Sequence, residues 1–101
     1  MWFKVDGGTV WQFETSNAGT QVTNTSAGTF TSATAYRLGF IFDPNDGTTG
    51  KITPYLNGVE GTTHSITLAS LTEMRLVLGV KAGGANAETL KMDYVQVLAV
   101  R

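Results

Sequence analysis

Apolar and polar residues alternate with a period of two along most of this chain. The alternation is clearest in residues 36–43, 74–80 and 90–100, where large apolar side chains occupy almost every second position. Shorter alternating runs cover residues 2–5, 10–14, 21–23, 51–56 and 63–68. Because successive side chains of a β-strand point to opposite faces, this period predicts strands that bury one face. We expect about seven or eight short strands, with a single helical turn at residues 68–72.

Turn-forming residues separate the predicted strands. Asp6-Gly7-Gly8 follows the first run, and Asn57-Gly58 is the signal for a type I′ hairpin. Further clusters of turn residues occupy 43–47 and 82–86. Short strands at regular spacing, with turns between them, are typical of an antiparallel β-sandwich. Since no linker or internal repeat interrupts the pattern, we expect one all-β domain over residues 1–101.

Four segments from Tyr36 onward carry a family resemblance. They are Tyr36-Arg37-Leu38-Gly39-Phe40, Tyr55-Leu56-Asn57-Gly58-Val59, residues 74–80, and residues 90–97 with their Asp93-Tyr94 pair. In this order they resemble the concanavalin A-like lectin and glucanase sandwich, the jelly roll shared with laminin G-like modules. The resemblance implies an antiparallel jelly roll. Because that jelly roll is usually longer than this chain, we expect a truncated version that keeps an open sheet edge.

The closing segment, residues 88–101, also resembles the ends of tailed-phage structural proteins. Proteins of that kind decorate capsids or tails. The resemblance therefore implies a virion-associated domain, located in the virion or in the host cytoplasm during assembly. Charged residues make up 15% of the chain, below the ~25% of an average soluble domain, and this low charge is consistent with such a setting.

Composition and charge exclude several classes of partner. The 101 residues include seven Lys and Arg against eight Asp and Glu, for a net charge of −1. We therefore expect no nucleic-acid surface, which requires clustered basic residues. The absence of Cys excludes disulfides and Cys-ligated metals. The pattern contains no signal peptide and no apolar run of about 18 residues, so we expect no membrane helix.

The residues that catalysis would need are scattered along the chain. Glucanases of the family named above use paired carboxylates at Glu-x-Asp-x-x-Glu spacing, and no Glu of this chain has an Asp two residues later. The chain also lacks the Gly-x-Ser-x-Gly motif of a Ser nucleophile. His64 is the only histidine, and we expect it on the surface at a strand edge. We therefore predict that the protein is not an enzyme.

One turn could bind calcium. Asp43, Asn45 and Asp46 offer carboxylate and amide oxygens, which are the ligands that Ca²⁺ prefers. The spacing departs from the EF-hand loop, because the glycine comes one position early and no Glu stands at the twelfth position. The alternative is a Pro-initiated turn in which Asp43 accepts a hydrogen bond from its own backbone.

Aromatic residues could bind a sugar. Exposed Trp and Tyr rings stack on the CH groups of a pyranose, and we take Trp11, Tyr55 and the neighbouring Asn57 as candidate glycan ligands. The alternative is that Trp11 and Tyr55 fill the core or a subunit interface, because a small sandwich needs most of its aromatic residues for packing.

These observations favour a non-enzymatic structural or interaction module that binds other protein subunits, as a homo-oligomer or in a virion lattice. Apolar residues on the second face of the predicted strands support this hypothesis; they are Ile41, Val77, Val95, Val97 and Ala99. A monomer that exposed all of them would carry an unusual hydrophobic patch. The alternative hypothesis is a lectin-like carbohydrate-binding module, assisted by calcium at Asp43 and Asp46.

Overall fold

The computed structural model describes residues 1–5, 8–17, 19–70 and 89–98. In these residues, strands form two antiparallel sheets, and a single 3-10 turn is the other regular element. The all-β prediction with antiparallel sheets is confirmed. No helix in the described ranges has the length and apolar character that crossing a membrane requires.

The first sheet has three strands in the order β1-β2-β3. They are β1 (Trp2–Lys4), β2 (Val10–Asn17) and β3 (Thr20–Thr29). Strand β2 lies in the centre, where Phe13 is opposite Phe3 of β1, and Thr15 is opposite Val22 of β3. A register shift between Trp11 and Phe13 marks a bulge in the β2–β3 ladder.

The second sheet is built around β5 (Thr49–Leu56). Strand β4 (Leu38–Asp43) pairs with one side of β5, while β6 (Val59–Glu60) and β7 (His64–Thr67) pair with its other side. The turn η1 (Leu68–Ser70) follows β7, at the place where the sequence predicts a helical turn. Residues 71–72 of that prediction lie outside the described ranges.

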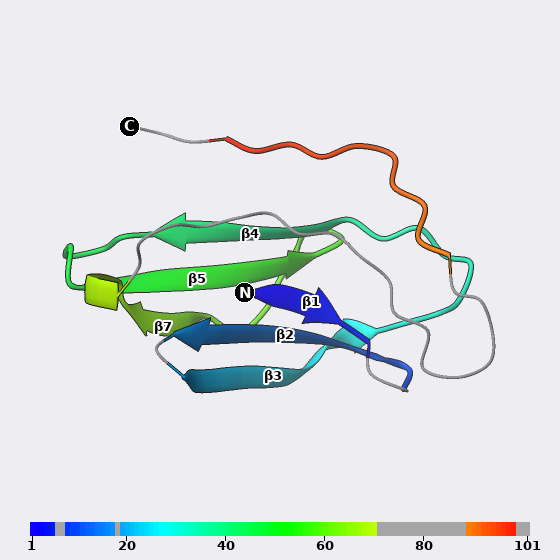
Figure 1. Ribbon diagram of the computed structural model, residues 1–101. Coiled ribbons are helices and arrows are strands. Elements are labelled where there is room, and N and C mark those ends of the chain that lie inside the picture. Colours follow the sequence, from blue (N-terminus) through cyan, green and yellow to red (C-terminus); the bar gives the residue numbers. More distant parts are fainter. Residues whose placement is uncertain (6–7, 18, 71–88, 99–101) are drawn as a thin grey trace.

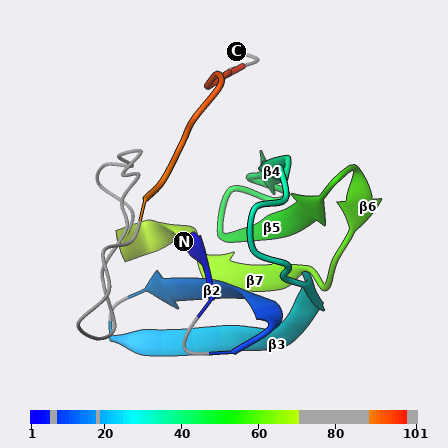
Figure 2. The same cartoon turned by 90° about the vertical axis from the view of Figure 1, so that its right-hand side faces the viewer.

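The two sheets lie in different layers (Figures 1 and 2) and meet where β7 contacts β2. Three apolar side chains are buried between them: Phe13 of β2, Ile52 of β5 and Ile66 of β7. Partly buried side chains pack around this core, namely Met1, Phe3, Ala27, Phe42 and Leu68. The core therefore combines residues that lie far apart in the sequence.

Strand β5 shows how the predicted period is realised. Gly50, Ile52 and Pro54 are buried, whereas Lys51 between them is exposed. Gly50 must be small, because a Cβ built there would lie 2.6 Å from a Leu68 methyl carbon and 2.8 Å from a Phe42 ring carbon. Real Cβ atoms do not approach other atoms this closely, so the inner face of β5 is closely packed.

The predicted hairpin at Asn57-Gly58 is confirmed. Asn57 has a φ of 53° and Gly58 a φ of 84°, as a type I′ turn requires at both central residues. The turn joins β5 to β6, with Leu56 opposite Val59. An Asn-Gly pair suits this conformation, because both residues tolerate a left-handed backbone.

The strands predicted at residues 74–80 and 90–100 are not seen in the described part of the structure. Residues 74–80 and 99–101 lie outside the described ranges. Residues 89–98 alternate in the sequence as a strand would, but form no strand, and every one of them is exposed. A strand needs a neighbour with which to exchange backbone hydrogen bonds, and no strand in the described ranges pairs with this segment.

Candidate functional site

The predicted calcium ligands form a hydrogen-bonded turn after β4. The backbone N–H of Asn45 donates to Asp43 Oδ1 (2.8 Å). Asp46 Oδ1 accepts from the N–H groups of Thr48 (2.8 Å) and Thr49 (2.7 Å). The hydrogen bonds from Thr49 and Thr48 lower the pKa of the Asp46 carboxyl. These contacts support the turn alternative, and calcium binding stays a prediction.

The three predicted glycan ligands make separate interactions. The Tyr55 hydroxyl donates to Oε2 of Glu60 on β6 (3.1 Å), and burial together with this carboxylate raises the pKa of Tyr55. Asn57 is bonded to the backbone of Arg37: its Oδ1 accepts from the Arg37 N–H (2.8 Å), and its own N–H donates to the Arg37 carbonyl (2.7 Å). The Asn57 carboxamide oxygen therefore holds the chain as it enters β4.

Trp11, the third candidate, lies in an aromatic cluster. Its ring meets those of Phe3, Phe30 and Tyr36 edge-on, with centroids 6.4, 5.5 and 5.4 Å away. The indole Nε1 is buried and has no hydrogen-bond partner among the described residues. Trp11 is half-buried within this cluster, and glycan binding at these positions stays a prediction.

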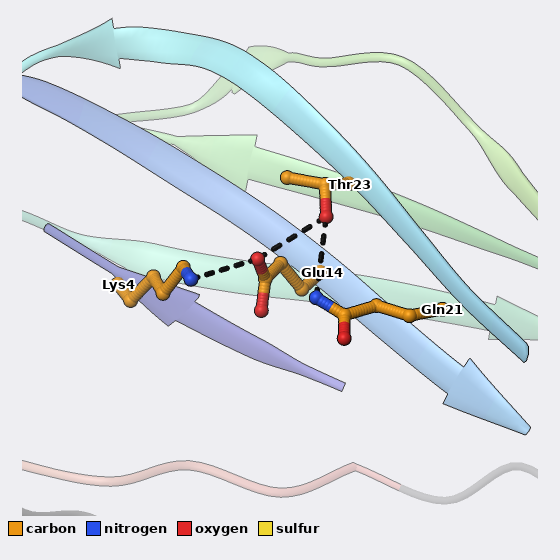
Figure 3. A network of polar contacts seen from close by, with 4 residues as sticks. All are labelled: Lys4, Glu14, Gln21 and Thr23. Atoms are coloured by element: carbon orange, nitrogen blue, oxygen red, sulfur yellow. Dashed lines mark hydrogen bonds and ion pairs between the residues drawn. The ribbon is translucent and has the colours of Figure 1, made fainter. Parts of the chain in front are cut away.

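A buried carboxylate lies in the centre of the first sheet (Figure 3). Glu14 of β2 is only 3% exposed. Lys4 Nζ of β1 lies 2.9 Å from its Oε1, and the Thr23 hydroxyl of β3 donates to the same oxygen (3.1 Å). Burial alone would raise the pKa of Glu14, but the hydrogen bonds and the charge of Lys4 lower it below the ordinary value of 4.5. Glu14 is therefore held as an anion that links the three strands.

His64 is buried, which corrects the expectation of a surface residue. It is 4% exposed, and its Nδ1 lies 2.9 Å from Oγ1 of Thr15, itself 2% exposed. The imidazole packs against Phe13 with a centroid distance of 5.2 Å. Burial lowers the pKa of His64. His64 faces the interior because the even-numbered positions of β7 face the first sheet. Thr15 provides the polar partner that a buried imidazole needs.

A groove of about 330 Å³ lies beside this contact, between the ends of β2 and β3 and strand β7. Its lining consists of Thr15, Asn17, Thr20, Val22, Ser65, Ile66 and Thr67. These side chains are hydroxyl, amide or aliphatic groups. None of these described lining residues is an acidic or basic side chain that could act as a general acid or base.

The outer edge of the second sheet is apolar. Strand β4 ends the strand order and pairs only with β5 among the described strands. Leu38, Phe40 and Ile41 of β4 are 40%, 44% and 57% exposed. Leu38 and Phe40 lie on the same face as the buried Ile52 and Pro54, but the first sheet leaves them uncovered. We call this surface of β4 the β4 edge.

The segment of residues 89–98 exposes more apolar surface than β4 does. Its exposed large apolar residues are Leu90, Met92, Tyr94, Val95, Val97 and Leu98. Figure 2 shows the segment extending away from both sheets. Two apolar surfaces, the β4 edge and this segment, therefore lie open in the described part of the protein.

Comparisons with known proteins identify no relative. No family model, no curated protein and no solved structure matches this chain.

Sequence reasoning found part of this apolar surface. Ile41 was expected on the second face of its strand, and it is the most exposed large apolar residue of β4. The exposure of Leu38 and Phe40 was missed, because alternation assigns them to the buried face. Only the extent of the first sheet decides whether that face is covered.

Proposed function

We propose that this protein is a non-enzymatic structural and interaction module that associates with other protein subunits, including copies of itself. One observation carries the proposal: the β4 edge combines exposed apolar side chains with a sheet edge that has no described neighbour. Exposed edge strands readily pair with a strand of another chain. Exposed apolar surface adds a non-directional contribution to the same association.

The net charge supports the same class of partner. A net charge of −1 provides little long-range attraction or repulsion. Association would therefore depend on apolar contact and backbone hydrogen bonds, and it would change little with salt. We include in the proposal a truncated jelly-roll topology and a place on a phage particle. The sequence resemblances of residues 36–97 and 88–101 support these two points.

Light scattering of the intact protein over a range of concentrations tests the proposal. The expected result is an oligomer whose mass decreases when Ile41→Asp places a negative charge on the β4 edge. Val59→Asp is a matched control, because Val59 is 71% exposed on the short strand β6. A monomer at every concentration would contradict the proposal. If both variants lowered the mass of the oligomer equally, the interface would not lie at β4.

A further inference from the structure

The backbone of β4 is oriented to accept another strand. The Asn57 N–H donates to the Arg37 carbonyl, and Leu38 is opposite Leu56 in the following pair. Backbone groups alternate between the two sides of an antiparallel strand. The N–H and C=O groups of Leu38, Phe40 and Phe42 therefore point away from β5, toward the open side of β4.

Residues 89–98 have the properties of a strand that could pair with the side of β4 that no described strand occupies. They alternate with a period of two, with Leu90, Met92 and Tyr94 on one face and Lys91 and Asp93 on the other. They are exposed along their whole length and form no strand. An alternating segment of this kind gains both backbone hydrogen bonds and apolar contacts when it joins a sheet edge.

The charged residues of the segment and of β4 favour one register between the two strands. When the strands run antiparallel with Lys91 opposite Asp43, two opposite charges face each other. The same register places Met92 beside Phe42 and Tyr94 beside Phe40, which extends the apolar face of the sheet. A register shifted by two residues would place Asp93 opposite Asp43, and like charges directly opposite are destabilising.

A second copy of the chain can supply the added strand. Residues 89–98 pair with no strand in the described part of their own chain, and every one of them is exposed. Building on the proposed function, we infer that residues 91–96 of one copy pair antiparallel with β4 of another, with Lys91 opposite Asp43. If two copies each add their segment to β4 of the other, they form a dimer. If each copy adds its segment to β4 of the next copy, they form a ring or an open chain.

The β3 edge fits this segment less well than β4 does. Strand β3 is also an outer strand of its sheet, and its sequence, TQVTNTSAGT, is mostly polar. Met92 and Tyr94 would gain little apolar contact beside Thr and Gln residues. The β4 edge instead offers the exposed side chains of Leu38 and Phe40.

Disulfide trapping tests the pairing, because the chain has no Cys of its own. Ile41 would be opposite Asp93, in a non-hydrogen-bonded pair whose side chains are close enough for a disulfide. Ile41→Cys and Asp93→Cys are made as separate full-length variants, one carrying an affinity tag. The two proteins are mixed and oxidised, and the mixed disulfide is quantified on a non-reducing gel. Both positions are exposed, so both variants are expected to fold.

The matched control replaces Asp93→Cys by Met92→Cys, which places the thiol on the opposite face of the segment. We expect about tenfold more mixed disulfide from the Ile41/Asp93 pair than from the Ile41/Met92 pair. Adding an excess of a synthetic peptide of residues 89–98 should reduce the mixed product.

Three outcomes would overturn the inference, and they separate it from the proposed function. An oligomer with no preference for the Ile41/Asp93 pair removes the inference and leaves the proposed function standing. A monomer without cross-links removes both. The double variant Ile41→Cys/Asp93→Cys distinguishes the remaining case: an internal disulfide in a dilute monomer would show that the segment pairs with its own β4.

Discussion

Thr15 on β2 and His64 on β7 share a buried hydrogen bond of 2.9 Å that joins the two sheets across 49 residues of sequence. The Asn17 carboxamide makes a second link, donating to the Thr67 carbonyl of β7 at 2.6 Å. Apolar contact among Phe13, Ile52 and Ile66 holds the sheets together without fixing their relative position. Directional hydrogen bonds fix it, because a shift of one residue would leave buried polar groups unpaired.

The stability of the protein should fall in mild acid because of His64. Its folded-state pKa lies below the unfolded value of 6.5, so the folded state favours the neutral ring. This contribution is complete above pH 6.5 and is lost as the pH falls toward the folded-state pKa. Urea unfolding at several pH values between about 5 and 7.5 measures it. The chain has no other His, so His64→Gln should remove most of the pH dependence in this range. A variant with unchanged pH dependence would contradict the assignment to His64.

Replacing Glu14 should destabilise the first sheet. Glu14→Gln removes the charge that Lys4 faces while keeping the side-chain shape, and we expect a loss of about 1–2 kcal/mol in the free energy of unfolding at neutral pH. Because the folded-state pKa of Glu14 is lowered, its contribution is present above pH 4.5 and is lost as the pH falls through the folded-state pKa. Chemical unfolding of wild type and variant should therefore converge at low pH. Glu60→Gln is the control, because Glu60 is exposed. A difference that persists at low pH would mean that Glu14 acts through packing and not through its charge.

Adding one methyl group to β5 should destabilise the core. At Gly50 a Cβ would overlap the Leu68 and Phe42 side chains, and we expect Gly50→Ala to cost about 1–3 kcal/mol of stability. Gly39→Ala on the neighbouring strand is the matched control, since a Cβ there meets no atom within 4 Å. Thermal unfolding of the two variants should separate them clearly. Equal melting temperatures would show that the core at Gly50 can expand without strain.

Asp46 should stabilise the turn after β4 even when no calcium is present. Asp46→Ala removes the acceptor for the Thr48 and Thr49 N–H groups, and we expect a lower melting temperature. Asp46→Asn keeps an acceptor oxygen and should retain most of the stability. Thermal unfolding with and without added Ca²⁺ tests the earlier metal prediction in the same experiment. A calcium-induced rise that both variants abolish would favour the metal site over the turn.

Local features of the sequence determined the strands and turns that need little tertiary information. Asn57-Gly58 produced the type I′ hairpin because both residues adopt a positive φ at low cost. The alternation along 51–56 placed Ile52 and Pro54 inside because a strand turns every second side chain to the same face. The all-β class followed from these local rules.

Only the tertiary structure decided which polar residues are buried and which apolar residues are not. Nothing adjacent to His64 in the sequence reveals that Thr15 lies beside it, because the two strands meet through long-range packing. Phe40 has the alternation of a core residue, yet it stays exposed where the first sheet ends. Residues 89–98 have the pattern of a strand and form none. The alternation of a strand's sequence determines which face of the sheet each side chain lies on. Whether that face is buried depends on whether another part of the structure packs against it.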